Sequence, residues 1–261
     1  MNRSTLLVLA LPLVAYLMAF FYIPFIVLSY YSFIDAETGR VTLDNYLEII
    51  REPAYFNVVL YSIVLAGETV VLTLILSFPA SYYIALHSRG AEKVALLIVM
   101  ITPFWIDFLL RALAMKNILY LLGFREGYYS MLAAMVYDYL PFMFLPLYAS
   151  LSRISPSILE AARSLGARDR DLILRIILPM SLPGIIAGFT LVFLMSLTEY
   201  VIPSLLGGTK GFTIGTMIYH LFLSGDMWGE GSALTLAITL GLLAASIIVS
   251  RRLSRFEAYQ A

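Results

Sequence analysis

The sequence predicts an all-α membrane protein with six transmembrane helices. Of its 261 residues, 61% are hydrophobic and 13% are charged, which is about half the charged fraction of a typical soluble domain. The mean hydropathy is +0.89. Apolar runs of about twenty residues, the length that a helix needs to cross a hydrocarbon core of roughly 30 Å, recur along the chain between polar segments.

The composition also excludes several classes of function. The formal net charge is zero, so nothing indicates a nucleic-acid partner. The absence of cysteine excludes disulfides and thiolate metal sites and leaves the redox compartment open. The two histidines, His87 and His220, are far apart in the sequence, so we expect no histidine-based metal site.

The first predicted membrane helix lies within residues 1–31. It carries Arg3 and then an apolar run longer than the apolar region of a signal peptide, so we expect it to be retained. Residues 35–57 are polar, and apolar side chains at helical spacing predict a short surface helix there: Leu43, Tyr46, Leu47 and Ile50. The second span, residues 58–86, is interrupted by Glu68 and has a predicted kink near Pro79.

The other segments alternate between apolar and polar in the same way. They are a polar turn at 87–93, a third span at 94–113, a loop at 116–127, a fourth span at 128–151, a fifth span at 183–203, a loop with partial re-entry at 204–231, and a sixth span at 232–250. Each span is long enough to cross a bilayer. With six spans, both termini lie on one side of the membrane.

One long segment, residues 155–186, is too charged for a bilayer. Six charged residues lie between Glu160 and Asp171. Ser155 can cap a first helix with Pro156 in its first turn, or Ser157 can cap it with Glu160 as the return partner of a capping box. Gly166 occupies the position of a left-handed helix stop. We predict a second short helix over residues 168–177, ending before Pro179.

The basic residues predict the orientation. Eleven of the 17 Lys and Arg residues lie at the two termini, in the turn at 87–93 and around the charged segment. Because positive charge accumulates on the cytoplasmic side, both termini and the segment at 155–178 are expected in the cytoplasm.

The charged segment resembles the EAA loop of permease subunits in binding-protein-dependent ABC importers. The resemblance is carried by Glu160-Ala161-Ala162, Gly166-Ala167, Leu178-Pro179 and Pro183-Gly184-Ile185. It implies the MetI-like permease fold in one transmembrane domain, 1–261, with a cytoplasmic coupling helix in residues 155–178. It also implies the residues that dock on an ATPase subunit: Glu160, Ala161, Ala162, Gly166, Ala167, Leu178 and Pro179. Alternatively, Glu160 serves as a helix cap and Gly166 as a helix stop. These structural roles are compatible with docking, so both interpretations can hold together.

Ionisable residues inside the spans are candidates for a solute pathway, because they usually face a cavity or a partner. These residues are Glu68, Asp107, Arg111, Asp138 and Glu199. If Asp138 and Glu199 line a pathway, they attract a cation. Nearby aromatic side chains can add cation–π contacts: Trp105, Tyr137, Tyr139 and Tyr200. The alternatives are that Asp107 pairs with Arg111 four residues on, that Asp138 caps or hydrogen-bonds inside the bundle, and that the tyrosines are interface anchors.

Longer runs are similar to permeases of the spermidine/putrescine branch, nearest to the B-type subunit. They are Pro103-Phe104-Trp105 with Arg111, residues 139–148, and residues 199–208. Where the branch commonly has Asp, this chain has Glu199, and Asp138 stands where an uncharged residue is usual. The resemblance implies a polyamine or other small cation as the solute. Trp105, Asp107, Asp138, Glu199 and Tyr200 are therefore the predicted pathway residues.

The resemblance also implies a multi-pass protein of the plasma (inner) membrane that contacts membrane lipid and works with several partners. These are a second homologous permease subunit, two ATP-binding subunits and an extracytoplasmic substrate-binding protein. The chain has no GxxxxGK[ST] motif, so we expect no cofactor and no enzyme activity here, with ATP and Mg²⁺ bound by the ATPase subunits. Three alternatives are an ATP-independent secondary transporter or channel, a non-transporting scaffold subunit, and an intramembrane enzyme, for which the sequence offers no catalytic constellation.

Overall fold

The computed structural model describes residues 11–35 and 38–257, and side-chain exposure as far as residue 247. The predicted start of the first span, with Arg3, lies outside the described residues. The regular secondary structure of the described residues consists of α-helices and short 3₁₀ and π segments, apart from an isolated bridge between Ile34 and Val41. Five of its helices are long and apolar enough to cross a membrane, and a sixth span is formed if a bent helix pair is counted as one. The predicted all-α membrane fold is confirmed.

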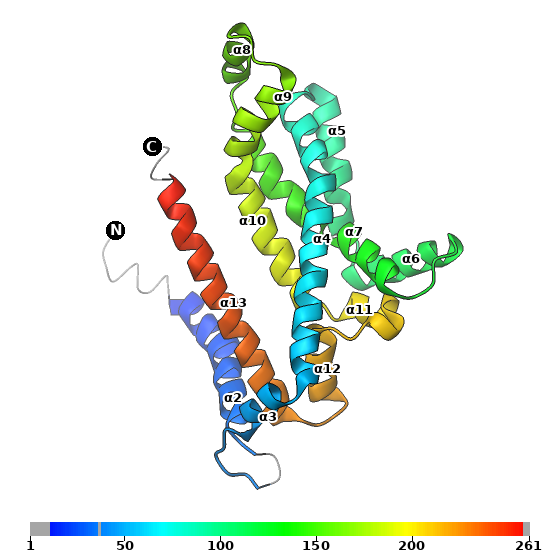
Figure 1. Cartoon of the computed structure of the whole chain (residues 1–261), viewed down its shortest axis with the longest axis vertical. Coiled ribbons are helices and arrows are strands. Elements are labelled where there is room, and N and C mark those ends of the chain that lie inside the picture. Colours follow the sequence, from blue (N-terminus) through cyan, green and yellow to red (C-terminus); the bar gives the residue numbers. More distant parts are fainter. Residues whose placement is uncertain (1–10, 36–37, 258–261) are drawn as a thin grey trace. The chain divides into compact units, whose positions relative to one another are not determined.

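The chain divides into two compact units, and Figure 1 labels the helices of both. The first comprises residues 1–57 and 217–249, and the second comprises residues 58–216 and 250–261. Three helices pass from one unit to the other: α4 (Pro53–Leu86), α12 (Ile214–Leu223) and α13 (Trp228–Glu257), of which residues 228–249 belong to the first unit.

The first unit contains the helical segment Leu11–Ser32, whose last part is α2 (Ile23–Ser32), the short helix α3 (Asp44–Arg51) and α13 (Trp228–Glu257). The surface helix predicted within residues 35–57 is therefore present as α3. The Asn45 side chain donates to the carbonyl oxygens of Ser32 and Ile34, at 3.0 and 3.1 Å. Tyr55 at the start of α4 donates to the Glu230 carboxylate of α13 at 2.6 Å. These contacts connect the ends of the unit's helices.

The second unit contains most of α4 and the helices that follow it. They are α5 (Gly90–Ile101), a 3₁₀ turn (Thr102–Trp105), α6 (Phe108–Leu121), α7 (Tyr128–Leu151), α8 (Pro156–Ser164), α9 (Asp169–Leu172), a π-turn (Ile173–Ile177), α10 (Leu178–Leu197), α11 (Val201–Leu206) and a 3₁₀ turn (Gly208–Lys210). Helix α7 has the bounds predicted for the fourth span. It contributes Met131, Met135, Tyr139, Met143 and Leu147 to the main core of this unit.

Small residues bring the neighbours of α7 close to its backbone. On α4, Ser77 and Ser81 donate to the carbonyl oxygens of Leu140 and Phe144, each at 3.3 Å. On α10, Gly184 lies against α7 so closely that a Cβ built there would be 2.5 Å from the Pro146 carbonyl oxygen. Small residues at helix contacts are typical of membrane bundles, where lipid supplies no hydrophobic drive for association. Pro79, the residue near which the sequence predicts a kink, lies inside α4.

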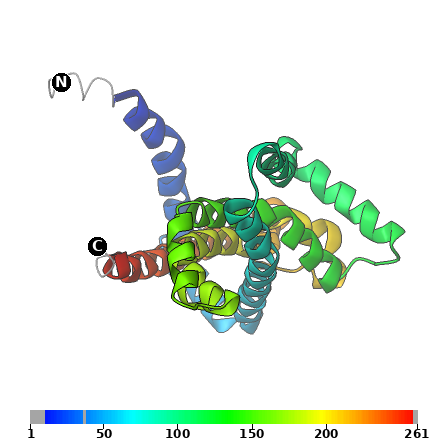
Figure 2. The same cartoon turned by 90° about the horizontal axis from the view of Figure 1, so that it is seen from above.

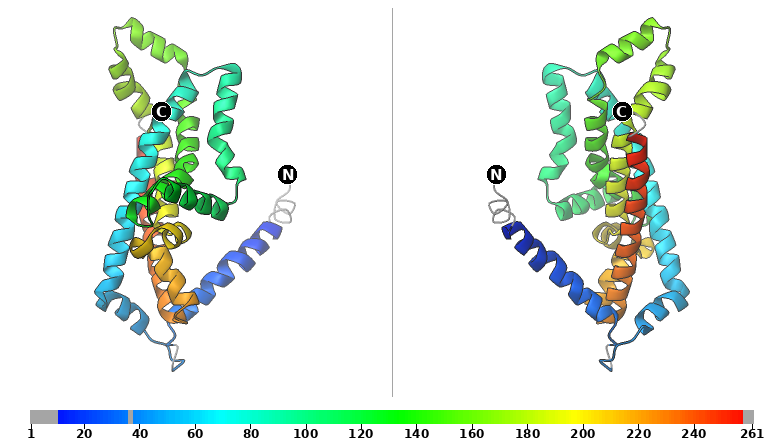
Figure 3. Two further views of the ribbon diagram at one scale, coloured as in Figure 1. Left: turned by 90° about the vertical axis from the view of Figure 1, so that its right-hand side faces the viewer. Right: turned by 90° about the vertical axis from the view of Figure 1, so that its left-hand side faces the viewer.

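The third predicted span is not one straight helix, which corrects the sequence-based prediction. Helices α5 and α6 meet at 101°, and the bend is visible in Figure 3. The turn around Pro103 ends α5, Ile106 is extended with ψ 135°, and the Asp107 side chain accepts from the N–H groups of Leu109 and Leu110 to begin α6. The polar N-cap favours a new helix start at this point. The span is therefore broken inside an apolar stretch.

The fifth span was also predicted with different limits. The helix runs without interruption from Asp169 to Leu197, through Pro179 and Pro183. A π-turn precedes Pro179, in which the Leu178 N–H donates to the carbonyl of Ile173. The wider turn accommodates a residue that has no N–H and whose ring would clash with the carbonyl four residues earlier. The predicted stop before Pro179 was wrong. The helix ends at Leu197, whereas the fifth span was predicted to continue to residue 203.

Candidate functional site

The charged segment forms an elbow between α7 and α10. Helix α8 leaves the end of α7 and α9 returns to α10, and Figure 2 shows this elbow from above. Pro156 occupies the first turn of α8 as predicted, but neither Ser155 nor Ser157 caps the helix with its side chain; the two hydroxyls contact each other. The capping-box alternative with Glu160 is therefore not what the structure has.

Gly166 ends α8 in the left-handed conformation, with φ +86°. The Gly166 N–H donates to the Arg163 carbonyl at 2.9 Å, and the Ala167 N–H donates to the Ala162 carbonyl at 3.0 Å. These two bonds form a Schellman motif, which satisfies carbonyls at the end of a helix and favours glycine at its left-handed position. The predicted helix stop is confirmed.

One face of the elbow is anchored and the other is open. Leu159, Ala162 and Ala167 pack against a small core made of Leu151, Ile154, Leu172 and Ile177. Glu160, Ala161, Gly166 and Leu178 are exposed, and Pro179 is half-buried at the start of α10. Leu165 is 89% exposed at the tip of α8. The elbow therefore presents an apolar tip and small residues on a base that is fixed to α7 and α10.

Arg111 and Asp138 form a buried ion pair between α6 and α7. The Arg111 Nη2 atom lies 3.2 Å from the Asp138 Oδ1 atom, and the two side chains are 7% and 4% exposed. Within residues 11–35 and 38–257, the Nε and Nη1 atoms of Arg111 find no hydrogen-bond partner. The predicted alternative that Arg111 pairs with Asp107 was wrong, because Asp107 caps α6 instead.

Glu199 is buried at the junction of α10 and α11. Its Oε1 atom accepts from the backbone N–H groups of Val201 and Ile202, at 2.7 and 3.3 Å. Its Oε2 atom accepts from the Tyr139 hydroxyl. The carboxylate therefore connects the start of α11 to the middle of α7.

An open recess of about 370 Å³ lies beside this carboxylate. Its lining residues are Phe108, Tyr139, Met195, Thr198, Glu199, Tyr200 and Val201. Two predicted pathway residues, Glu199 and Tyr200, thus lie at one cavity. Trp105 is 82% exposed and does not line it. Tyr139, which the sequence indicates as an aromatic residue near the acidic side chains, also lines the recess, whereas the sequence offers no signal for Phe108.

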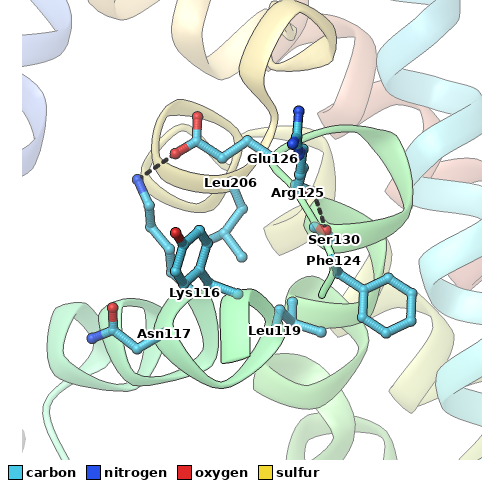
Figure 4. A pocket seen from close by; sticks show the side chains of 9 residues that line it. Lys116, Asn117, Leu119, Phe124, Arg125, Glu126, Ser130 and Leu206 are labelled. Carbon is cyan, nitrogen blue, oxygen red and sulfur yellow. Dashed lines mark hydrogen bonds and ion pairs between the residues drawn. The ribbon is translucent and has the colours of Figure 1, made fainter. Parts of the chain in front are cut away.

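A second cavity of about 250 Å³ lies at the other end of α6 (Figure 4). Lys116 and Glu126 pair across it at 2.7 Å, and the Ser130 hydroxyl donates to the Arg125 carbonyl at 2.6 Å. Leu206 of α11 also lines it. None of the predicted pathway residues lines this cavity.

Residues 71–257 match the family described as binding-protein-dependent transport system inner membrane component. The chain belongs to this family. It is 32% identical to the spermidine/putrescine transport system permease protein PotB of Escherichia coli (strain K12) over 93% of this chain and 95% of that protein. It is 31% identical to PotB of Haemophilus influenzae over 92% and 91% of the two chains.

Among solved structures, a bacterial alginate ABC transporter in complex with an alginate pentasaccharide-bound periplasmic protein has a chain that superposes with a TM-score of 0.73. The superposition covers 96% of this chain and 95% of the other, at 19% identity. This likeness shows a shared fold. Permeases of this family are multi-pass inner-membrane components, so the predicted membrane localisation is confirmed, and the predicted family and fold are confirmed with it.

Proposed function

We propose that this permease subunit moves a small cationic solute, most simply a polyamine, into the cell. The observation that carries the proposal is the recess lined by Glu199 and Tyr200. Its buried carboxylate can compensate the charge of an ammonium group, and the tyrosines among its lining residues can add cation–π contacts. The relatives that cover nearly the whole chain are named for spermidine and putrescine transport, which supports the same solute class.

The fold alone does not determine whether the solute is a cation or an anion. The structural neighbour with TM-score 0.70 is described as importing the acidic polysaccharide alginate, whereas PotB is named for polyamines. A shared fold supports different functions through its side chains. The acidic recess is therefore the feature that favours a cation over an anion.

The energy for transport comes from separate ATPase subunits that bind ATP and Mg²⁺ and dock on the α8 elbow. The exposed tip with Leu165 and the small residues Ala161 and Gly166 suits close approach by another protein. A second permease subunit and a solute-loaded extracytoplasmic binding protein complete the transporter. Both termini and α8 then lie in the cytoplasm, in agreement with the basic residues around α8.

Gly166→Trp in the complete transporter tests the docking. The chain offers a matched control in Gly123, which has φ +86° and nothing within 4 Å of an added Cβ, as does Gly166. Gly123 ends α6 with the same pair of backbone hydrogen bonds, from Gly123 to Tyr120 and from Phe124 to Leu119. A side chain at either glycine carries the same left-handed strain, about 1–2 kcal/mol.

We expect Gly123→Trp to co-purify with the ATPase subunits and Gly166→Trp to lose them or lose solute-stimulated ATP hydrolysis. If Gly166→Trp assembles and hydrolyses ATP as well as Gly123→Trp does, α8 is not the docking element.

Glu199→Gln tests the solute class by spermidine uptake into proteoliposomes. Glutamine keeps an acceptor for Val201 and Ile202 and can donate to the Tyr139 oxygen, so the variant should fold. Glu68→Gln is the control, because Glu68 is an exposed carboxylate that also accepts from a tyrosine, Tyr128, at 2.6 Å. We expect uptake to fall only in Glu199→Gln; wild-type uptake in that variant contradicts the proposal.

A further inference from the structure

The buried charge of the second unit is concentrated in one connected cluster. Among residues whose exposure the structure describes, the buried charged side chains are Arg111, Asp138 and Glu199. Arg111 pairs with Asp138, and the next residue along α7, Tyr139, donates to Glu199. With one positive and two negative members, the cluster has a net charge of one negative unit.

Arg111 lies close enough to the recess for its charge to matter there. Its Cζ atom is 6.0 Å from the centre of the Phe108 ring, and Phe108 lines the recess together with Glu199. Asp138 is the carboxylate that pairs with this guanidinium, and in the described part of the chain the Arg111 Nε and Nη1 atoms have no hydrogen-bond partner. Arg111 and Glu199 are both buried, and charges in a protein interior interact more strongly than charges in water.

We propose that Asp138 is a specificity-determining residue, which acts as the counter-ion of Arg111 and leaves the Glu199 charge as the net charge that a solute meets at the recess. This inference rests on the proposed transport of a cation. It assigns Asp138 an indirect role: the carboxylate neutralises the arginine and does not contact the solute. Without it, the recess has a buried arginine and a buried glutamate of cancelling charge, and a cation gains nothing by entering.

The two members of the pair are not equivalent when one is removed. Arginine cannot lose its proton in a protein, so Asp138→Asn makes the cluster more positive by one unit. Arg111→Gln cannot make the cluster more positive, because the remaining carboxyl stays charged or becomes neutral by binding a proton. A role in selectivity therefore predicts unequal effects of the two variants on a cation, whereas a purely structural ion pair predicts similar losses.

The test measures the KM for spermidine uptake by the complete transporter in proteoliposomes. We expect Asp138→Asn to raise KM by about tenfold or more, in line with an unpaired buried charge at a binding site. Arg111→Gln should stay within about threefold of wild type, and the double variant Arg111→Gln/Asp138→Asn should also return to within about threefold, because its net charge is again one negative unit. Co-purification with the ATPase subunits shows that each variant is assembled.

Equal increases in KM for the two single variants, or an unchanged KM in Asp138→Asn, overturn the inference. If Asp138→Asn does not assemble, Arg111→Gln is compared with the double variant. Equal spermidine uptake by these two variants supports the counter-ion role of Asp138. Loss of uptake in the double variant alone shows that Asp138 contacts the solute, and this result overturns the inference. If spermidine uptake falls in Glu199→Gln but Asp138→Asn and Arg111→Gln behave alike, this inference is refuted and the cation proposal is not. Unchanged uptake in Glu199→Gln refutes the cation proposal itself.

Discussion

The contact between α7 and α10 gives a quantitative prediction at Gly184. A Cβ built on this residue would lie 2.5 Å from the Pro146 carbonyl oxygen, 2.6 Å from the Ser150 Cβ and 3.1 Å from the Leu147 Cα. Non-bonded heavy atoms prefer about 3.5–4.0 Å, so Gly184→Ala requires α10 to move away from α7 by about 1 Å, a gap at which packed neighbours lose a quarter to a half of their attraction. Overpacking of this kind costs about 1–3 kcal/mol.

Two other glycines calibrate this value. At Gly188 the nearest atom is the Sδ of Met143, at 2.6 Å, and the backbone of Met143 is 3.3 Å away. Because a methionine side chain is flexible, we expect Gly188→Ala to cost less than Gly184→Ala. Gly67 is inside α4 with nothing within 4 Å, so Gly67→Ala should be neutral or stabilising by up to about 1 kcal/mol, the helix preference of alanine over glycine.

The assay is unfolding of the purified, detergent-solubilised chain by heat or denaturant, followed by circular dichroism. The expected order of stability is Gly67→Ala, then Gly188→Ala, then Gly184→Ala. A Gly184→Ala chain as stable as Gly67→Ala would refute the close backbone contact on which the arrangement of α7 and α10 depends.

Three further predictions use the same unfolding assay. Tyr139→Phe removes the donor of the buried Glu199 carboxylate and should cost about 1–3 kcal/mol, whereas Tyr128→Phe, whose partner Glu68 is exposed, should cost less than about 1 kcal/mol; equal costs would contradict the difference in burial. Asp107→Ala should cost about 0.5–2 kcal/mol by removing the N-cap of α6, with Asp107→Asn close to wild type; an unchanged Asp107→Ala would show that the cap does not hold the bend. The Ser81 hydroxyl bonds to the Phe144 carbonyl at 3.3 Å, which is long, so we expect Ser81→Ala to cost no more than the average hydrogen bond between membrane helices, about 0.6 kcal/mol. A loss above about 2 kcal/mol would show a stronger contact than the structure has.

The sequence was informative wherever a local rule decides the structure. The limits of α7 follow from an apolar run between a Gly-containing loop and a polar segment. The end of α8 follows from Gly166, because a left-handed helix stop strongly favours glycine. Both features depend on residues close together in the chain, so composition and spacing were sufficient to predict them.

The sequence was uninformative where distant residues decide. Apolar residues continue through the α5–α6 bend, so hydropathy could not separate one span from two helices at 101°. Arg111 has an acidic residue four positions earlier and another 27 positions later, and spacing favours the nearer one. The structure pairs it with Asp138 because Asp107 is already used as a helix cap. Glu199 was identified as an ionisable residue within an apolar run, but its contact with Tyr139 depends on the packing of α7 against α10.

The two ends of the proposed mechanism are carried by the same pair of helices. Helix α7 contains Asp138 and Tyr139 and leads to α8, and α10 leads from the elbow to Glu199. Between these ends Gly184 and Gly188 bring α10 close to α7, and at Gly184 the nearest atom is the Pro146 carbonyl oxygen of the α7 backbone. Closely packed interiors transmit strain and do not absorb it. Displacement of α8 by a docked subunit would therefore move both helices and alter the Tyr139–Glu199 contact beside the recess. The glycine contacts thus link the proposed docking elbow to the proposed solute site by a route made entirely of residues in one compact unit.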